Sequence, residues 1–424
     1  MAQQELRRFD VTGWAPEDVA NPYPVYQRYR DNDPVHWSPA TAASTGSWYV
    51  FGYDDVASVL SSQHFGRNSH VARAGDAAAP ALVPASYDSL RRIVQNWLVF
   101  MDPPQHTELR SLVNKEFSPK VVTALRTRIK DIATALLAEQ RGKSVIELVD
   151  GFAAPFPILV ISELLGVPED LCGWFRECAV SLQEASTARA GRDADGYRRA
   201  EAAAQELAGY FRQQAQRRRG EDHHNLVSLL VRARDRGEPL TDDEIVGTCV
   251  HLLTAGHETT TNVICKSVLA LLGNPDVLHE LRAHPGLMRT AVDELVRYDS
   301  PVQMVTRWAY RDEVLHGRDI HRGDKVVLVL GSANRDPLQF PDPDALCLDR
   351  GTSRHCGFGF GIHYCLGANL ARAEAEIGLT TLLENLPQLS LTGEPVQYAD
   401  DMVFHGPARL VLRTGVGTSN EETS

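Results

Sequence analysis

The stretch FGFGIHYCLG, from Phe358 to Gly367, places one cysteine in a glycine-rich run and leads directly into a segment with helical spacing. A thiolate at Cys365 would therefore lie beside a helix N-terminus, where free backbone N–H groups and the helix dipole stabilise negative charge. The glycines do not complete a nucleotide-binding GxGxxG motif, because Tyr364 occupies the third glycine position and no GK[ST] follows. The stretch predicts a cysteine with a chemical role rather than a phosphate site.

Two roles stay open for Cys365 at this point. A nucleophile would need a base that a third group orients, whereas a metal-bound sulfur needs nearby backbone donors that tune it. Gly359, Gly361 and Gly367 remove side-chain bulk, so that a flat macrocycle and backbone N–H groups could both reach the sulfur. The glycine content favours the metal ligand.

A long central segment, Thr241 to Leu272, has the spacing of one helix of about 45 Å and begins with a capping-box signature. Its middle reads TAGHETTTN, which is polar where a core helix would be apolar. A zinc-peptidase HExxH motif is excluded, because Thr261 stands where the second histidine is needed. Taken alone, Thr259 is most simply a threonine whose hydroxyl bonds back to a carbonyl one turn earlier.

Two further pairs are weak signals when considered alone. Glu294 and Arg297 are three residues apart near a helix end, where ion pairs are common on surfaces and contribute about 0.2–0.5 kcal/mol. His106 and Arg110 are four residues apart after Pro103-Pro104, and the pair could bind an anionic group or form a solvated helix face.

Composition bounds the class of protein. The chain has 424 residues, 43% hydrophobic and 23% charged, which is typical of a globular protein. Its net charge of −12 disfavours nucleic acid and anionic membrane surfaces as partners. No signal peptide is recognisable in the first residues, so we expect a cytoplasmic protein without membrane association. Seven scattered cysteines without a CxxC pair argue against a disulfide framework or a zinc ribbon.

The pattern of apolar residues predicts a mainly α fold with minor β structure, in one domain spanning residues 1–424. About residues 1–8 and 415–424 are expected to be flexible. Helical spacing covers Pro119 to Leu137, Asp195 to Arg219, Thr241 to Leu272 and Pro285 to Tyr298. WYVFGY, DKVVLVLG and ARLVLR read as strands, and Ser69 to Ser86 reads as a long loop.

Taken together, these motifs resemble the cytochromes P-450, the haem-thiolate monooxygenases, in bacterial soluble members. FGFGIHYCLG is similar to their cysteine-ligand loop. The other segments stand in the family's order before this loop. DPPQHTELR is in the place of the early haem-facing helix, AGHETT of the central helix, ELVR of the Glu-x-x-Arg helix and NRDPLQFPDPDALCLDR of the meander. The resemblance covers nearly the whole chain and outweighs the separate surface interpretations of each pair. It departs from the common pattern at Leu346-Cys347 and Cys356-Gly357.

The resemblance implies the cofactor haem b (iron protoporphyrin IX), with Cys365 as the iron ligand whose electron donation favours O–O cleavage. It implies that Glu258 and Thr259 form the acid–alcohol pair that delivers protons to O2, and that Ala255 and Gly256 leave room above the iron. In the family, four further positions neutralise the haem propionates. The residues of this sequence at those positions are His106, Arg110, Arg307 and His363. Phe358, Gly359 and Gly367 would surround the sulfur, and Glu294, Arg297 and Arg350 would form an ion-pair network that holds the loop.

By analogy with the family, a largely apolar substrate pocket would include His257, Val302, Gln303, Met304, Val305, Met402, Val403 and Phe404. His257 could equally be a helix filler. The expected substrate is a small lipophilic molecule, such as a polyketide, terpenoid or steroid, that becomes hydroxylated or epoxidised.

Electrons would come from a separate ferredoxin and ferredoxin reductase, docked near Lys115, Arg354 and Arg372. Two alternatives remain: a peroxide-using or oxidative-coupling haem-thiolate enzyme, and a haem protein that binds or senses a ligand without catalysis.

Overall fold

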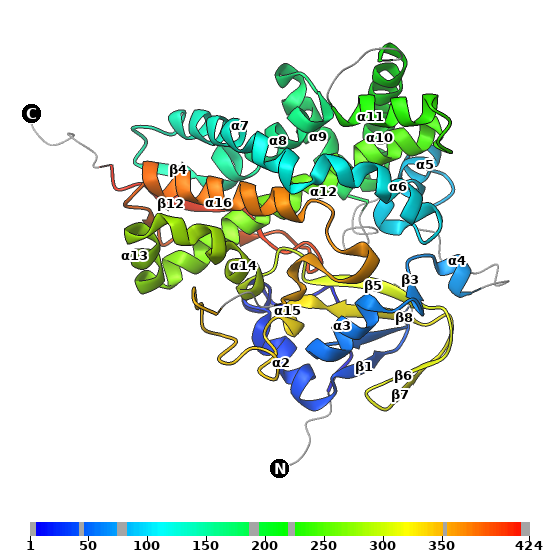
Figure 1. The fold of residues 1–424 in the computed structure, drawn as a ribbon. Helices are drawn as coiled ribbons and strands as arrows, with labels where there is room; N and C mark the ends of the chain where they lie inside the picture. Colours follow the sequence, from blue (N-terminus) through cyan, green and yellow to red (C-terminus); the bar gives the residue numbers. More distant parts are fainter. Residues whose placement is uncertain are drawn as a thin grey trace, which may run out of the picture.

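The computed structural model describes residues 6–41, 46–73, 83–185, 195–218, 225–350 and 354–416. Its fold is mainly helical with a smaller β-rich part, as the sequence predicts. Figure 1 shows the two parts: the helices around α12 fill the upper half, and the five-stranded sheet lies in the lower half. The segment that contains Cys365 and α16 runs between them.

The helices differ widely in length. They are α1 (Pro16–Ala20), α2 (Tyr23–Asn32), α3 (Tyr53–Ser61), α4 (Ser69–Ala72), α5 (Asp88–Gln95), α6 (Gln105–Val113), α7 (Pro119–Ala138), α8 (Pro155–Leu165), α9 (Cys172–Gln183), α10 (Gly196–Arg217), α11 (Leu226–Asp235), α12 (Asp242–Gly273), α13 (Pro275–Ala283), α14 (Met288–Tyr298), α15 (Leu330–Ala333) and α16 (Ala368–Asn385). α12 packs against α5, α8, α10, α14 and α16, so it is the centre of the helical part.

The start of α12 has the predicted capping box. The Thr241 hydroxyl accepts a hydrogen bond from the Glu244 N–H at 3.1 Å, and the Glu244 carboxylate accepts one from the Thr241 N–H at 2.8 Å. These two bonds satisfy backbone donors that a helix start leaves unpaired. The helix then continues without interruption through the polar AGHETT sequence.

The main sheet has the strand order β1-β2-β8-β5-β3, with β2 and β8 parallel and the other pairs antiparallel. Three smaller sheets contain the remaining strands. The bounds are β1 (Val35–Ser38), β2 (Ser47–Val50), β3 (Phe65–Gly66), β4 (Val145–Glu147), β5 (Met304–Ala309), β6 (Glu313–Leu315), β7 (Arg318–Ile320), β8 (Lys325–Val329), β9 (Ser390–Leu391), β10 (Gln397–Tyr398), β11 (Pro407–Arg409) and β12 (Val411–Arg413).

Several predicted elements have other bounds in the structure: the WYVFGY strand ends at Val50, and the DKVVLVLG strand ends at Val329, before α15. ARLVLR is two strands in two sheets, because the Leu410 N–H between them donates to the Glu147 carboxylate at 2.8 Å instead of continuing one ladder. The helix predicted from Pro285 begins at Met288, after the 3₁₀ turn Pro285–Leu287. The predicted loop begins with the short helix α4, and its residues 74–82 lie outside the described residues, as do the predicted flexible ends at 1–5 and 417–424.

The helical part has one large hydrophobic core and a small separate cluster between α12, α14 and α16, whereas the β-rich part has two clusters on either side of its sheet. Within the described ranges, every helix is too short or too polar to cross a membrane. All seven cysteines are free thiols, and five of them are buried.

Candidate active site

The segment around Cys365 is a tight backbone loop between two 3₁₀ turns and α16. The Cys365 N–H donates to the Phe358 carbonyl at 2.8 Å, and the Gly359 N–H donates to the Cys356 carbonyl at 2.8 Å. Gly359 and Gly361 have φ angles of 70° and 68°, in the left-handed region that glycine adopts without steric cost. The loop therefore presents the Cys365 side chain just before the first turn of α16.

The glycines of the loop are required for different structural reasons. A Cβ atom at Gly361 would lie 2.5 Å from the Leu60 carbonyl oxygen, so this glycine lets the loop approach α3 closely. A Cβ atom at Gly367 would meet no atom within 4 Å, which leaves its side of the loop open. The sequence suggested that all three glycines leave open space beside the sulfur. The structure has this open space at Gly367, whereas Gly359 and Gly361 are needed for the path of the backbone.

Burial raises the pKa of the Cys365 thiol, while the Gly367 N–H and the guanidinium groups of Arg110 and Arg372 act in the opposite direction. Arg110 also donates to the Tyr364 carbonyl, which places its positive charge against the loop. A bound metal cation would deprotonate a thiol in this position outright. The surroundings of Cys365 are those of a sulfur ligand.

Basic side chains gather beside this loop. Arg307 is 5% exposed and His106 is 1% exposed, and the rings of His106 and His363 lie 4.3 Å apart. Burial lowers the pKa of His363 to about 2, that of Arg307 to about 10 and that of Arg67 to about 9, and repulsion from neighbouring basic groups adds to the effect for His363 and Arg67. The pKa values of His106 and Arg110 are lowered as well, burial being the main cause.

This cluster fits a ligand that carries negative charge. Both ring nitrogens of His106 and Nε2 of His363 are buried without a hydrogen-bond partner, although buried polar atoms are usually paired. Asp102, which accepts the backbone N–H of Arg67 at 3.0 Å, is the carboxylate that opposes the charge of Arg67 and Arg307. Two propionate groups of a haem bound at Cys365 would supply the missing negative charge and acceptors.

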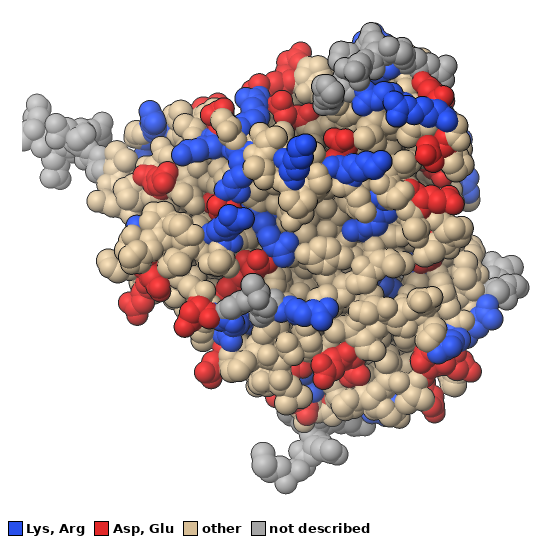
Figure 2. Space-filling view, in the orientation of Figure 1, with Lys and Arg blue, Asp and Glu red and all other residues tan. Residues whose placement is uncertain are grey.

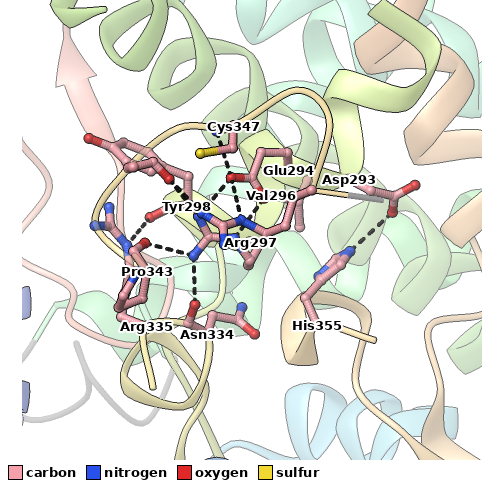
Figure 3. Close-up of polar contacts among 12 residues, drawn as sticks. Asp293, Glu294, Val296, Arg297, Tyr298, Asn334, Arg335, Pro343, Cys347 and His355 are labelled. Atoms are coloured by element: carbon pink, nitrogen blue, oxygen red, sulfur yellow. Dashed lines mark hydrogen bonds and ion pairs between the residues drawn. The ribbon is translucent and has the colours of Figure 1, made fainter. Parts of the chain in front are cut away.

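The predicted ion-pair network is present and buried (Figure 3). Arg297 donates to both carboxylate oxygens of Glu294 at 2.7 and 2.8 Å, and Arg350 donates to Glu294 at 3.0 Å. The remaining Arg297 donors bond to the carbonyls of Asn334, Pro343 and Ala345 at 2.8–3.1 Å. Arg297 is 0% exposed, and its donors thereby connect α14 to the meander that precedes the cysteine loop.

Two residues that the sequence did not suggest connect this network to the loop. The Asn334 side chain accepts the Cys356 N–H at 2.6 Å. Asp293 binds His355 at 3.0 Å and Arg372 at 2.8 Å, as Figure 3 shows for His355, and His355 in turn accepts the Gly357 N–H at 3.1 Å. Burial alone would raise the pKa of Asp293, but bonds from His355 and Arg372 lower it to about 2. Asp293 and Asn334 are single polar residues that the sequence analysis did not single out, so the sequence did not indicate that they connect the network to the loop.

On the opposite side of the site, α12 presents the AGHETT segment. Ala255 is exposed although it lies in the middle of the central helix, and Glu258 and Thr259 are half-buried. The Thr259 hydroxyl donates to the Ala255 carbonyl at 2.8 Å, as expected for a back-bonded threonine, and its oxygen remains able to accept a hydrogen bond. His257 lies about 200° around the helix from Thr259, so it faces away from the site.

The predicted pocket residues separate into two groups. Val302, Val305, Val403 and Phe404 are half-buried, and a β-bridge joins Val302 to Phe404. Met304 and Met402 are buried in the cluster of the N-terminal aromatic residues, and Val403 packs against the same cluster. Val302 and Val305 pack against the cluster on the other side of the sheet. Burial of His257 lowers its pKa to about 4.

Gln303 is fully buried, donates to the Ser300 carbonyl at 2.8 Å and lies against Gly331. Gln303, Met304 and Met402 are therefore corrected as substrate contacts, because their side chains are buried in the protein interior. His257, which the sequence left open as a helix filler, is buried on the face of α12 away from Thr259.

A buried acid that the sequence did not single out lies between the two sides. Glu374 of α16 is 3% exposed and accepts a hydrogen bond from the Thr260 hydroxyl of α12 at 3.2 Å. Burial raises the pKa of Glu374 to about 8, so the carboxyl group is mainly protonated at neutral pH. The pair joins the helix after the cysteine loop to the helix that carries Thr259.

Comparisons with known proteins agree with this geometry. A family model described as Cytochrome P450 matches residues 190–404. Cytochrome P450 109 of Bacillus spizizenii is 39% identical over 370 residues, covering 87% of this chain and 85% of that protein. The polyketide biosynthesis cytochrome P450 PksS of Bacillus subtilis is 34% identical over 91% of this chain and 94% of that protein. The crystal structure of P450BioI has a TM-score of 0.85 at 33% identity, covering 94% and 98% of the two chains.

The fold and the cysteine site define a haem-thiolate enzyme. The chain belongs to the cytochrome P450 family and is a monooxygenase that uses haem b. When bound, the haem would supply the iron at which dioxygen is activated. Cys365 would hold the iron, and Arg67, His106, Arg110, Arg307 and His363 would hold the propionates.

Replacing Glu294 tests the ion-pair network. In Glu294→Gln, Arg297 and Arg350 lose their shared carboxylate inside the protein, and the free energy of unfolding should fall by about 3–5 kcal/mol. Urea unfolding, followed by circular dichroism, measures this change. The control Glu376→Gln removes the partially exposed pair with Arg126 and should cost about 0–1 kcal/mol. Equal effects of the two substitutions would contradict a central role for Glu294.

Replacing Cys365 tests the ligand. The reduced wild-type protein with carbon monoxide should show the strongly red-shifted Soret band of a thiolate-ligated haem. Cys365→His should lose that band because imidazole is a weaker electron donor to iron than thiolate, whereas Cys347→Ser, outside the loop, should keep it. A histidine-type band in well-folded wild-type protein would contradict Cys365 as the ligand.

Proposed function

We propose that this monooxygenase works in the cytoplasm, takes electrons from a separate ferredoxin and ferredoxin reductase, and hydroxylates or epoxidises a lipophilic natural product. The proposal rests chiefly on one observation: half-buried apolar side chains from two segments, Val302, Val305, Val403 and Phe404, accompany an acid–alcohol pair on α12. Apolar walls with few polar groups bind lipophilic molecules and exclude water.

The relatives support a biosynthetic substrate. PksS is named for polyketide biosynthesis, and P450BioI was solved with an acyl carrier protein ligated to hexadec-9Z-enoic acid. A substrate of this chain is accordingly a polyketide or another long apolar skeleton. Substrate screens should include both the free molecule and the molecule attached to a carrier protein, because P450BioI binds the second form.

Proton delivery is the role that we propose for Glu258 and Thr259. The Thr259 hydroxyl is held by the Ala255 carbonyl, which fixes the direction of its oxygen toward the exposed surface of Ala255. An oriented hydroxyl can accept a hydrogen bond at the reacting oxygen, and a carboxyl group beside it can exchange protons with water. Glu258 is half-buried, so water can reach it.

The face that carries the cysteine loop suits an acidic redox protein. Figure 2 shows Lys and Arg side chains over α6, α7 and α16 on this face, although the net charge of the chain is −12. A cleft of about 730 Å³ opens there, lined by both basic and acidic side chains, so the positive charge of this face comes from the surface around it. Lys115 and Arg354 are exposed as the docking prediction requires, whereas Arg372 already binds Asp293 and stacks on Phe358 at 4.2 Å.

Thr259→Ala tests proton delivery. With a reconstituted redox chain and a substrate found by binding, the rate of product formation should fall about 10²-fold. Hydrogen peroxide should rise in proportion to NADPH consumed, since oxygen is still reduced. The matched control is Thr261→Val, because the Thr261 hydroxyl bonds to the Ala153 and His257 carbonyls instead. Unchanged coupling in Thr259→Ala would remove this residue from proton delivery.

Redox docking is tested by charge reversal. Lys115→Glu and Arg354→Glu should slow reduction by ferredoxin about tenfold at low salt, and the difference should shrink as ionic strength screens the charges. Arg318→Glu on β7, far from this face in Figure 1, is the control. Salt-independent reduction, or equal rates with hydrogen peroxide alone, would contradict ferredoxin as the electron source.

A further inference from the structure

A buried lysine lies on the same face of α12 as Thr259. Lys266 is 1% exposed and follows Thr259 by two helical turns. Its ammonium group donates to the Ser300 carbonyl at 2.7 Å, to the Asp299 carboxylate at 2.7 Å and to Nδ1 of His405 at 2.8 Å. An ammonium group has three donors, and each of them is used.

The partners of Lys266 are fixed by bonds of their own. His405 Nε2 lies 2.7 Å from the Val19 carbonyl, which can only accept, so Nε2 carries the proton and Nδ1 accepts from Lys266. Asp299 also accepts the Tyr23 hydroxyl at 2.6 Å. Burial lowers the pKa of Lys266, and Asp299 acts in the opposite direction, as a buried ion pair requires. The buried ammonium is thus compensated by a carboxylate and neutral acceptors.

Lys266 joins two segments distant in sequence, 299–305 and 401–406. The two segments also bond to each other: the Gln303 N–H donates to the Val403 carbonyl at 2.8 Å, and the His405 N–H donates to the Pro301 carbonyl at 3.0 Å. A second contact with α12 comes from Asn262, whose side chain fills the space beside Gly406 that a Cβ atom would need. These segments carry the half-buried apolar residues Val302, Val305, Val403 and Phe404.

We propose that Lys266 is a positioning residue that determines the shape of the substrate-facing wall and therefore which substrates the enzyme accepts. This inference rests on the proposed function, because it assigns the apolar side chains of both segments to the substrate. One ammonium group holds both segments at a set distance from α12, the helix that carries Thr259. Without it, Asp299 would lose the cation that pairs with it directly and keep only the weaker electrostatic interaction with Arg335, and the two segments would separate from α12.

The test measures the segments directly and then the pocket. In Lys266→Met, which keeps the length of the side chain and removes its charge, hydrogen exchange of the Gln303 and His405 amides in the haem-loaded protein should accelerate about tenfold or more. His405→Phe is the second variant, since a phenyl ring can still stack on Tyr398, whose ring lies 5.1 Å away, while both hydrogen bonds are lost. The controls Val268→Ala and Leu271→Ala destabilise α12 away from these segments.

The pocket is probed with two iron-binding azoles. Econazole is bulky, so its binding depends on contacts with the apolar side chains of the two segments as well as on the iron. Imidazole is small, so its binding depends on the iron bond alone. In Lys266→Met and His405→Phe, the dissociation constant for econazole should rise about tenfold and that for imidazole should change less than about twofold. Binding is followed by optical titration and by equilibrium dialysis.

The outcomes separate the two hypotheses. Unchanged amide exchange, or equal changes for econazole and imidazole, or the same pattern in Val268→Ala, would contradict the role of Lys266. A wild-type protein without a thiolate-type spectrum would contradict the proposed function instead, and the amide exchange would still decide whether Lys266 positions the two segments.

Discussion

The buried pair of Glu294 and Arg297 is the interaction on which the site depends. A guanidinium with no exposed surface must have all its donors paired, because an unpaired buried charge costs several kcal/mol. Arg297 meets this condition only where the meander carbonyls come to it. Pairing the donors of Arg297 thus fixes the position of Asn334, whose carbonyl accepts one of them. The Asn334 side chain in turn accepts the Cys356 N–H, at the start of the cysteine loop.

Electrostatics divides the site into two parts with different needs. Beside the cysteine loop, arginines and histidines are buried together, and burial is the main cause of their lowered pKa values. An anionic occupant such as the haem propionates would stabilise these buried positive charges. At the far end of α12, Lys266 and Asp299 compensate each other within the protein. The first cluster is built for a ligand and the second for the fold.

The central helix relates these parts to one another. α12 is a rigid element of 32 residues that carries Ala255 and Thr259 on the face of the site, Thr260 against Glu374, and Lys266 against the two apolar segments. Because one helix carries all these residues, the distance along α12 between Thr259 and Lys266 is a property of helix geometry. The proposed proton delivery and the proposed positioning of the two apolar segments would therefore be coupled through the same backbone.

The sequence by itself determined the family and located the cysteine loop, the Glu258-Thr259 motif and the Glu294 pair, because each is a local motif with a recognisable spacing. It also located the long helices, since their apolar periodicity and caps are local signals. The roles of Arg67, Asp293, Asn334, Glu374 and Lys266 were decided only by the tertiary structure. Each is an isolated polar residue whose partner lies far along the chain, and its side chain has meaning only when folding has removed it from water. The same reason explains the errors at Gln303, Met304 and Met402: the sequence placed them near the pocket, but tertiary packing buried their side chains in the interior.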